Sequence, residues 1–146
     1  MPSVLMDTNI LVYTFDPRDV IRQEQAIALL LKLEEHNAGC LSAQCLAEFT
    51  NVAISKRRLS LDEIIRKVDG WRNVFPVYDL TPQIVLEAAR GVRDHQLAYY
   101  DAQIWASARL NQIPTVFSED FQDGQRLEGV RFANPFTDSF KIDEWL

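Results

Sequence analysis

Apolar residues along the chain fall into two kinds of segment. Short apolar runs, which are typical of buried strands, occur at residues 3–6, 39–41, 77–80, 115–117 and 130–132. Apolar residues spaced three and four apart, which are typical of helices packed on a core, mark residues 21–36, 60–74 and 81–95 and the segments that begin near 7, 42 and 100. Because strands and helices alternate, the pattern predicts an α/β sandwich on a parallel sheet.

Residues that favour helix starts support several of these boundaries. Ser42 stands at the start of one expected helix, and Ser60 and Glu63 have the spacing of a capping box. Thr81 followed by Pro82 is typical of an N-cap and the first helical turn. These signals predict where three of the helices begin.

Four carboxylates interrupt the apolar pattern: Asp7 after the first strand, Glu48 within a helix, Asp101 at a helix start and Asp120 after the fourth strand. Taken singly, three of them could be ordinary cap or turn residues. Glu48 is harder to explain in this way, because it shares a helix face with apolar residues such as Val52 and that face is expected to be buried. An unpaired buried carboxylate is costly, and the carboxyl ends of parallel strands meet at one edge of a sheet. We therefore predict that the four acids converge on a divalent cation and form the site of a metal-dependent enzyme.

The composition predicts a single globular domain over residues 1–146. Hydrophobic residues make up 47% of the chain and charged residues 25%, and no stretch approaches the ~20 apolar residues that cross a bilayer. The N-terminus lacks the basic and apolar regions of a secretory signal, so we expect a cytoplasmic protein with no membrane partner. Cys40 and Cys45 match no metal or disulfide pattern, which favours buried thiols.

The net charge of −6 argues against a simple nucleic-acid binder, because such proteins usually present a basic surface. Bound metal would offset part of this charge. Lys56, Arg57 and Arg58 form a locally basic stretch that could contact phosphates, although such a stretch is more often a solvated helix end. The charge therefore permits a polyanionic substrate without requiring one.

Other kinds of catalytic site find little support in the sequence. The five glycines do not have the spacing of a phosphate-binding loop. A phosphatase with an aspartate nucleophile would need a second aspartate two positions after Asp7, where Asn9 stands. His36 and His95 lie near the ends of expected helices, and their favourable interaction with the helix dipole is a sufficient explanation.

Four segments that contain the acids resemble a known family. Residues 6–13 (MDTNILVY), 46–52 (LAEFTNV), 100–108 (YDAQIWASA) and 118–124 (SEDFQDG) are similar, in order and spacing, to motifs of PIN-domain ribonucleases, and particularly of bacterial VapC-like toxins. Each motif alone is weak, but the four together are specific. The resemblance implies a PIN-like α/β/α sandwich with a short-stranded, mostly parallel central sheet.

The resemblance also implies roles for individual residues. The acids Asp7, Glu48, Asp101 and Asp120 would bind Mg²⁺ or Mn²⁺, with Asp123 as a further candidate ligand and Thr8, Asn9 and Ser118 as supporting hydrogen-bond donors. The metal would generate a nucleophile from water and stabilise the charge of the transition state during RNA cleavage. The implied partners are an RNA substrate, a small antitoxin protein and a second copy of the chain in a homodimer.

Two alternatives keep the same fold. One is a non-catalytic RNA-binding or scaffolding PIN domain, which normally lacks one or more of the acids and would bind no metal at neutral pH. The other is a structure-specific DNA nuclease with the same metal chemistry, which a comparison of RNA and matched DNA substrates would identify.

Overall fold

In the computed structural model, which describes residues 2–146, six strands form one central sheet. The strands are β1 (Val4–Met6), β2 (Gly39–Ser42), β3 (Val77–Tyr78), β4 (Thr115–Phe117), β5 (Arg126–Leu127) and β6 (Val130–Ala133). Their order across the sheet is β3-β2-β1-β4-β6-β5. All neighbours pair in parallel except β5 and β6, so the predicted mostly parallel sheet is confirmed.

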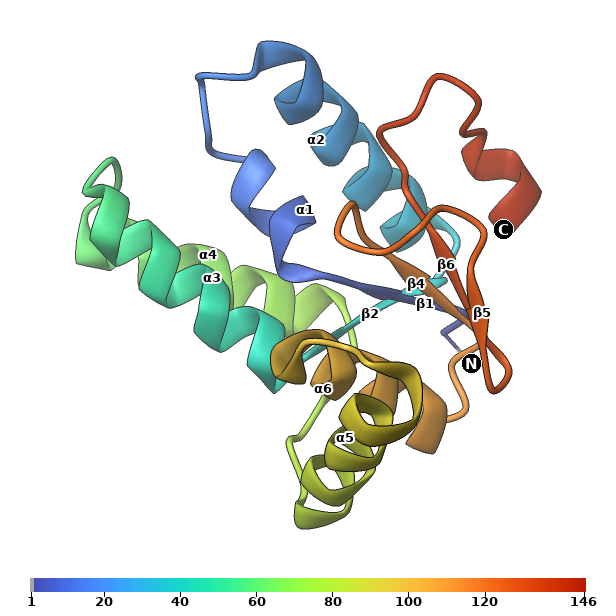
Figure 1. Cartoon of the computed structure of the whole chain (residues 1–146). Coiled ribbons are helices and arrows are strands. Elements are labelled where there is room, and N and C mark those ends of the chain that lie inside the picture. The colour runs from blue at the N-terminus through green and yellow to red at the C-terminus, as the bar shows by residue number, and fades with distance from the viewer. Residues whose placement is uncertain (1) are drawn as a thin grey trace.

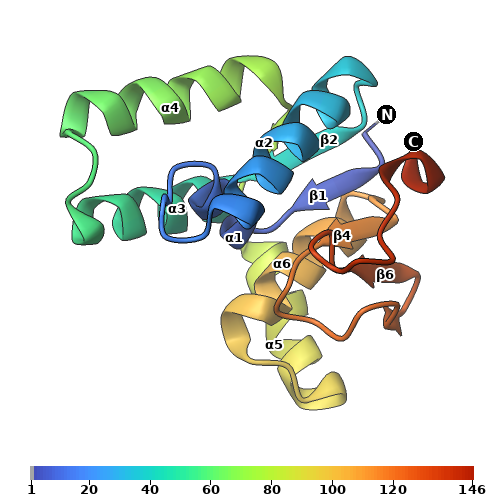
Figure 2. The same ribbon diagram turned by 90° about the horizontal axis from the view of Figure 1, so that it is seen from above.

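Helices cover both faces of this sheet. They are α1 (Thr8–Tyr13), α2 (Val20–Glu35), α3 (Ala43–Lys56), α4 (Leu61–Val74), α5 (Pro82–His95) and α6 (Tyr99–Leu110), followed by a short 3₁₀ helix, η1 (Ile142–Trp145). Figure 1 shows α1 and α2 on one side of the sheet and α5 and α6 on the other. In Figure 2, α3 and α4 lie side by side and project beyond the sheet. The predicted α/β/α sandwich is therefore confirmed.

The predicted helix starts agree with the caps in the structure. The Ser60 hydroxyl accepts a hydrogen bond from the backbone N–H of Glu63, and the Glu63 carboxylate accepts one from the backbone N–H of Ser60. The hydroxyls of Ser42 and Thr81 accept equivalent bonds at the starts of α3 and α5. Local side-chain chemistry therefore fixed these boundaries as the sequence indicated.

Two elements near the C-terminal end differ from the sequence prediction. Residues 118–129, expected to form a polar connection, contain β5, which pairs with β6 in a two-residue hairpin. The turn residues Glu128 and Gly129 both have positive φ, +48° and +86°, as a type I′ turn requires. η1 was also not expected. Glutamate at the first turn position hid the hairpin, because asparagine, aspartate or glycine is usual there.

The core is centred on β1 and β4. All three residues of β1 are fully buried, and the largest fully buried side chain is Trp105 of α6. Cys40 and Cys45 are buried and unpaired with each other, as predicted. Within the part of the chain that the structure describes, no helix is both long and apolar enough to span a membrane.

Candidate active site

Asp7 occupies the junction between β1 and α1, at the carboxyl end of the sheet. Its backbone N–H donates to the carbonyl of Phe117 (3.0 Å), so the end of β4 fixes its position. Its carboxylate accepts hydrogen bonds from the backbone N–H of Thr8 (2.7 Å) and from the hydroxyl of Ser118 (2.7 Å). The residue is only 4% exposed. Burial raises the pKa of the Asp7 carboxyl to about 7, in spite of these hydrogen bonds, and the negative charges of Asp120 and Glu48 raise it further.

Glu48 reaches the same edge of the sheet from α3. Its carboxylate accepts hydrogen bonds from the Thr8 hydroxyl (3.0 Å) and from the side-chain amide of Gln44 (2.7 Å), one helical turn earlier. Gln44 is itself held by the Gln103 side chain (2.8 Å) and by the backbone carbonyl of Tyr100 (3.0 Å). Through this chain of contacts, α1, α3 and α6 together orient one carboxylate.

The helix face that carries Glu48 is less buried than the sequence suggested. Cys45 and Phe49 on α3 are fully buried, but Glu48 and Val52 are only half-buried. The expectation that the whole face is buried is therefore wrong. The reason is that this side of α3 borders a groove instead of packing entirely against the core.

Asp101, from α6, and Asp120, from the segment after β4, complete the acidic set. Asp101 lies half-buried in the first turn of α6. Burial raises the pKa of its carboxyl, and the charges of Asp120 and Glu48 act in the same direction. Asp120 is exposed, accepts a hydrogen bond from the side-chain amide of Asn9 (3.1 Å), and donates its backbone N–H to the Ser118 hydroxyl (3.0 Å). The charges of Glu48 and Asp120 are thus close enough to act on the carboxyls of both Asp7 and Asp101, although only Asp7 is buried.

The donor set fits a hard divalent cation. It consists of carboxylate oxygens supported by hydroxyl and amide groups, which are the ligands that such ions prefer. The side-chain oxygen of Asn9 is buried at this edge without a hydrogen-bond partner. Among residues 2–146, however, no three His, Cys, Asp or Glu side chains stand close enough to hold one ion as they are placed. An ion here would complete its coordination shell with water or draw the side chains together.

Two of the acids line a groove that also contains basic residues. The groove has a volume of about 370 Å³. Its lining includes Glu48 and Asp120 at the acidic cluster, and Asp16, Arg18 and Lys56 further along. A chain-like substrate could therefore contact both groups of side chains at once.

The remaining predicted residues occupy different places. Thr8, Asn9 and Ser118 contact the acids, as described above. Asp123 lies in an exposed turn, where its carboxylate accepts a hydrogen bond from the backbone N–H of Asn134 (2.9 Å). That bond ties the turn before β5 to the end of β6. The basic stretch ends α3, and Arg57 is its left-handed C-cap with φ of +53°.

Sequence reasoning missed Gln44 and Asp16. Gln44 precedes Glu48 by four residues, a spacing that places the two on one helix face, and this was an available signal. Asp16 contacts Lys56 and Arg58, which lie about 40 residues away. No local pattern could have linked Asp16 to them.

The fold and the acid-lined groove define an α/β protein with a polar site at the carboxyl edge of its sheet. The family model of the PIN domain matches residues 4–123. The chain therefore belongs to the PIN domain family. No curated protein matches its sequence.

Solved structures with the same fold include toxins from toxin–antitoxin complexes. A toxin–antitoxin complex from Klebsiella pneumoniae superposes with a TM-score of 0.68 at 20% identity, covering 92% of this chain and 98% of the other. DNA-bound VapBC from Salmonella typhimurium gives 0.65 at 20% identity, with 92% and 99% covered. A VapC toxin from Mycobacterium tuberculosis that cleaves the sarcin–ricin loop gives 0.62 at 20% identity, with 81% and 92% covered. At this identity the likeness shows a shared fold.

Proposed function

We propose that this protein is a metal-dependent endoribonuclease of the VapC kind, the toxin of a toxin–antitoxin pair. The observation that carries the proposal is the cluster of Asp7, Glu48, Asp101 and Asp120 at one edge of a PIN-domain sheet, where burial and the charges of Asp120 and Glu48 raise the pKa of Asp7 and Asp101. Carboxylates crowded in this way are stabilised by a bound cation. Mg²⁺ or Mn²⁺ is the ion that an all-oxygen set of this kind would hold.

Each part of the cluster has a distinct task in this proposal. When bound, the divalent ion would supply a water of lowered pKa and a counter-charge for the phosphate. Asp7, locked by Thr8 and Ser118, gives a fixed ligand, and Glu48 is oriented by Thr8 and Gln44. Asp120, which is exposed and lines the groove, would contact the substrate as it enters.

The experiment compares Asp7→Asn with Asp138→Asn, which removes an exposed carboxylate outside the groove. Purified proteins would be incubated with single-stranded RNA and with DNA of matched sequence in Mn²⁺ buffer. We expect RNA cleavage by Asp7→Asn to fall at least about 100-fold, since a neutral amide cannot replace the charged ligand. Asp138→Asn should cleave like the wild type, and EDTA should abolish cleavage by the wild type and by Asp138→Asn.

Undiminished cleavage by Asp7→Asn would rule out the proposed site. Equal cleavage of RNA and DNA would favour the DNA-nuclease alternative. Absence of both cleavage and Mn²⁺ binding in calorimetry would favour a scaffold. Relief of growth arrest by Asp7→Asn in expressing cells would support the toxin assignment.

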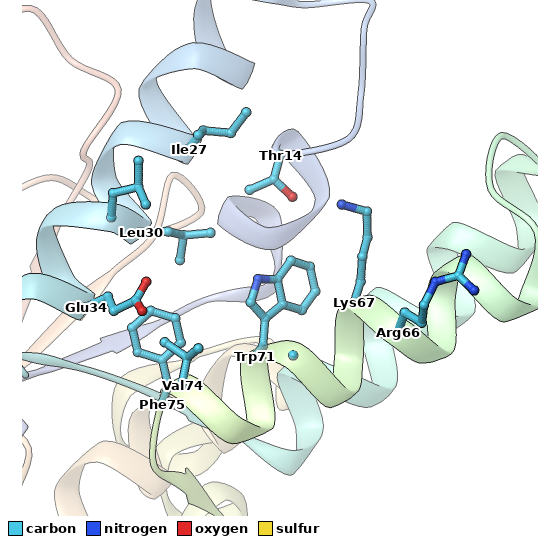
Figure 3. Close-up of a pocket in the computed structure, with 11 residues that line it drawn as sticks. Thr14, Ile27, Leu30, Glu34, Arg66, Lys67, Trp71, Val74 and Phe75 are labelled. Carbon is cyan, nitrogen blue, oxygen red and sulfur yellow. The ribbon is translucent and has the colours of Figure 1, made fainter.

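A second surface supports an antitoxin partner. Between α2 and α4 lies an apolar groove of about 400 Å³, lined by Ile27, Leu30 and Leu31 on one side and by Trp71 and Val74 on the other. Figure 3 shows these two walls facing each other, with Lys67 and Arg66 along α4. Ile27 and Leu31 are 43% and 55% exposed. We propose that an apolar segment of the antitoxin fills this groove.

Exposed apolar side chains also support the proposed homodimer. Leu86 on α5 and Tyr100 on α6 are 72% and 66% exposed, although both are large. Burial of these side chains against a second copy would remove apolar surface from water. Light scattering would measure the molecular mass of the wild type and of a variant with a charged residue in place of Leu86. We expect the mass of a dimer for the wild type and a shift towards the monomer for the variant.

A further inference from the structure

A buried carboxylate outside the acidic cluster contacts three cationic side chains. Asp16 lies between α1 and α2 and is 5% exposed. Its two oxygens accept hydrogen bonds from the guanidinium of Arg18 (3.0 and 2.8 Å). The ammonium of Lys56 lies 3.3 Å from one oxygen, and the guanidinium of Arg58 lies 3.6 Å from the other.

This arrangement leaves an excess of positive charge. One carboxylate neutralises one of the three cations, so the cluster carries a formal charge of about +2 in a chain whose net charge is −6. Within residues 2–146, none of these three cations forms an ion pair with another acid. The side chains of Arg18, Arg58 and Lys56 remain 59%, 36% and 28% exposed. Asp16 therefore anchors one face of each cation and leaves the rest accessible.

Most of the cationic cluster lines the groove of the proposed active site. Asp16, Arg18 and Lys56 line the same groove as Glu48 and Asp120, and Arg58 is joined to them by its contact with Asp16. The acids repel a phosphate unless metal is present, whereas the cations attract one at any metal concentration. The groove thus offers two kinds of phosphate environment along one path.

We propose that Arg18, Lys56 and Arg58 form a binding site for a backbone phosphate of the RNA, next to the phosphate that is cleaved, and that Asp16 is their positioning residue. This inference rests on the proposed ribonuclease function. Guanidinium groups match the geometry of phosphate oxygens, and a shared carboxylate holds two such groups and an ammonium before the substrate arrives. Arg57, which lies between two of these residues in sequence and is the C-cap of α3, forms no ion pair with Asp16 within residues 2–146, and its predicted RNA contact stays a prediction.

The first test measures RNA binding in the absence of cleavage. In an Asp7→Asn background, affinity for a labelled single-stranded RNA would be measured by fluorescence anisotropy in Mg²⁺ at a series of KCl concentrations. We expect Lys56→Ala/Arg58→Ala to weaken binding roughly tenfold or more, and to reduce the slope of log Kd against log salt by about 0.7 for the one phosphate contact that is lost. The control Arg72→Ala/Lys141→Ala removes two exposed cations outside the groove and should change neither quantity.

Cleavage kinetics give a second readout. With Asp7 intact, Lys56→Ala/Arg58→Ala should raise KM while kcat stays within about twofold, because the lost contacts hold the substrate and do not act on the reacting bond. Asp16→Asn removes a negative charge, so simple attraction predicts tighter RNA binding. Weaker binding by Asp16→Asn would show that this carboxylate positions the cations.

The outcomes are distinguishable from failure of the proposed function. If the wild type cleaves no RNA, the ribonuclease proposal fails, whereas the anisotropy result still reports on the phosphate site. If the wild type cleaves but Lys56→Ala/Arg58→Ala binds RNA with unchanged affinity and salt slope, the phosphate site is overturned. It is also overturned if that variant loses affinity only for the antitoxin. If thermal melts show that Asp16→Asn does not fold, the Lys56→Ala/Arg58→Ala variant still tests the proposed phosphate site.

Discussion

At the scale of single residues, Gln44 is the side chain that most directly sets the position of Glu48. It is buried, donates to the Glu48 carboxylate, and is fixed in turn by Gln103 and by the Tyr100 carbonyl. Groups that orient a metal ligand commonly affect metal affinity or activity by roughly 10–100-fold. The role of Gln44 can therefore be separated from that of Glu48, the proposed ligand.

We expect Gln44→Ala to lower RNA cleavage by roughly tenfold and to raise the Mn²⁺ concentration needed for half-maximal activity. The physical reason is that Glu48 would keep only its hydrogen bond from Thr8. Asn51→Ala, at an exposed position of the same helix, serves as the control. Identical metal dependence in both variants would show that Gln44 does not orient the ligand.

The sequence predicted the acids better than their surroundings. Asp7, Glu48 and Asp101 could be singled out because a charge in an apolar pattern is visible in one dimension. Two features could not be predicted: the exposure of Asp120 and the contact between Asp16 and Lys56. Both depend on how distant segments of the chain meet.

At the scale of elements, α5 and α6 form a tightly packed pair in which Gly91 faces Trp105. A Cβ atom at Gly91 would lie 2.8 Å from Cζ3 of the indole ring. The indole also donates to the carbonyl of Leu127 (3.1 Å), so α6 is tied to β5 and has little freedom to move away. Glycine is therefore required here by close approach of the two helices.

Alanine in place of glycine usually stabilises a helix, but at Gly91 we expect the opposite effect on stability. We expect Gly91→Ala to destabilise the protein by roughly 1–3 kcal/mol, because the added methyl group overpacks the contact with Trp105. Gly70→Ala in α4 is the matched control, since no atom lies within 4 Å of a Cβ there. That substitution should stabilise by about 0.5–1 kcal/mol through helix propensity. Urea unfolding of both variants measures the difference, and equal effects would contradict the close contact.

The hairpin of β5 and β6 is joined to α5 by an acid whose charge depends on pH. Glu128 accepts a hydrogen bond from Arg90 (3.0 Å) and contacts His95 (2.7 Å). The hydrogen bond from Arg90 is the main cause that lowers the pKa of the Glu128 carboxyl to about 2. A lowered pKa means that the stabilisation is present above the ordinary value and is lost as pH falls towards the lowered one.

We therefore expect Glu128→Gln to lower the melting temperature at pH 7 by a few degrees. This difference from the wild type should shrink as the pH falls from about 4.5 towards 2, because the wild-type carboxylate becomes protonated over that range. Melts followed by circular dichroism across this range provide the measurement. A difference that persists unchanged at pH 2 would show that the charge of Glu128 is not its source.

Most elements were predictable because each carries its own periodicity and cap. The hairpin was not, since β5 has only two residues and its turn begins with glutamate at positive φ. Pairing with β6 supplies the stability that the local sequence lacks. Tertiary context therefore decided the one strand that the pattern did not show.

At the scale of the whole molecule, the α2–α4 groove and the acid-lined groove are separate surfaces. The two grooves share no lining residue. Binding of the antitoxin and cleavage of RNA should accordingly be separable by substitution. Sequence patterns could not locate the apolar groove, because its walls are helices about 40 residues apart and each looks like an ordinary amphipathic helix.

We expect Leu31→Glu to weaken antitoxin binding by at least about tenfold, because it places a charge among apolar side chains. RNA cleavage by the protein without its partner should be unchanged within about twofold, because Leu31 lies outside the acid-lined groove. Calorimetry with the antitoxin and a cleavage assay together provide the check. Unaltered antitoxin affinity would place the partner elsewhere.

The order of strands in the sheet has a consequence for synthesis of the protein. β1 is made early, yet it lies in the middle of the sheet, and its partner β4 leaves the ribosome only after about a hundred further residues. Asp7 and Ser118, whose side chains meet, are 111 positions apart. Until that late segment emerges, the nascent chain cannot close the sheet or assemble the site. Under the proposed function, the nascent chain would therefore have no assembled site for RNA until most of the protein has been translated.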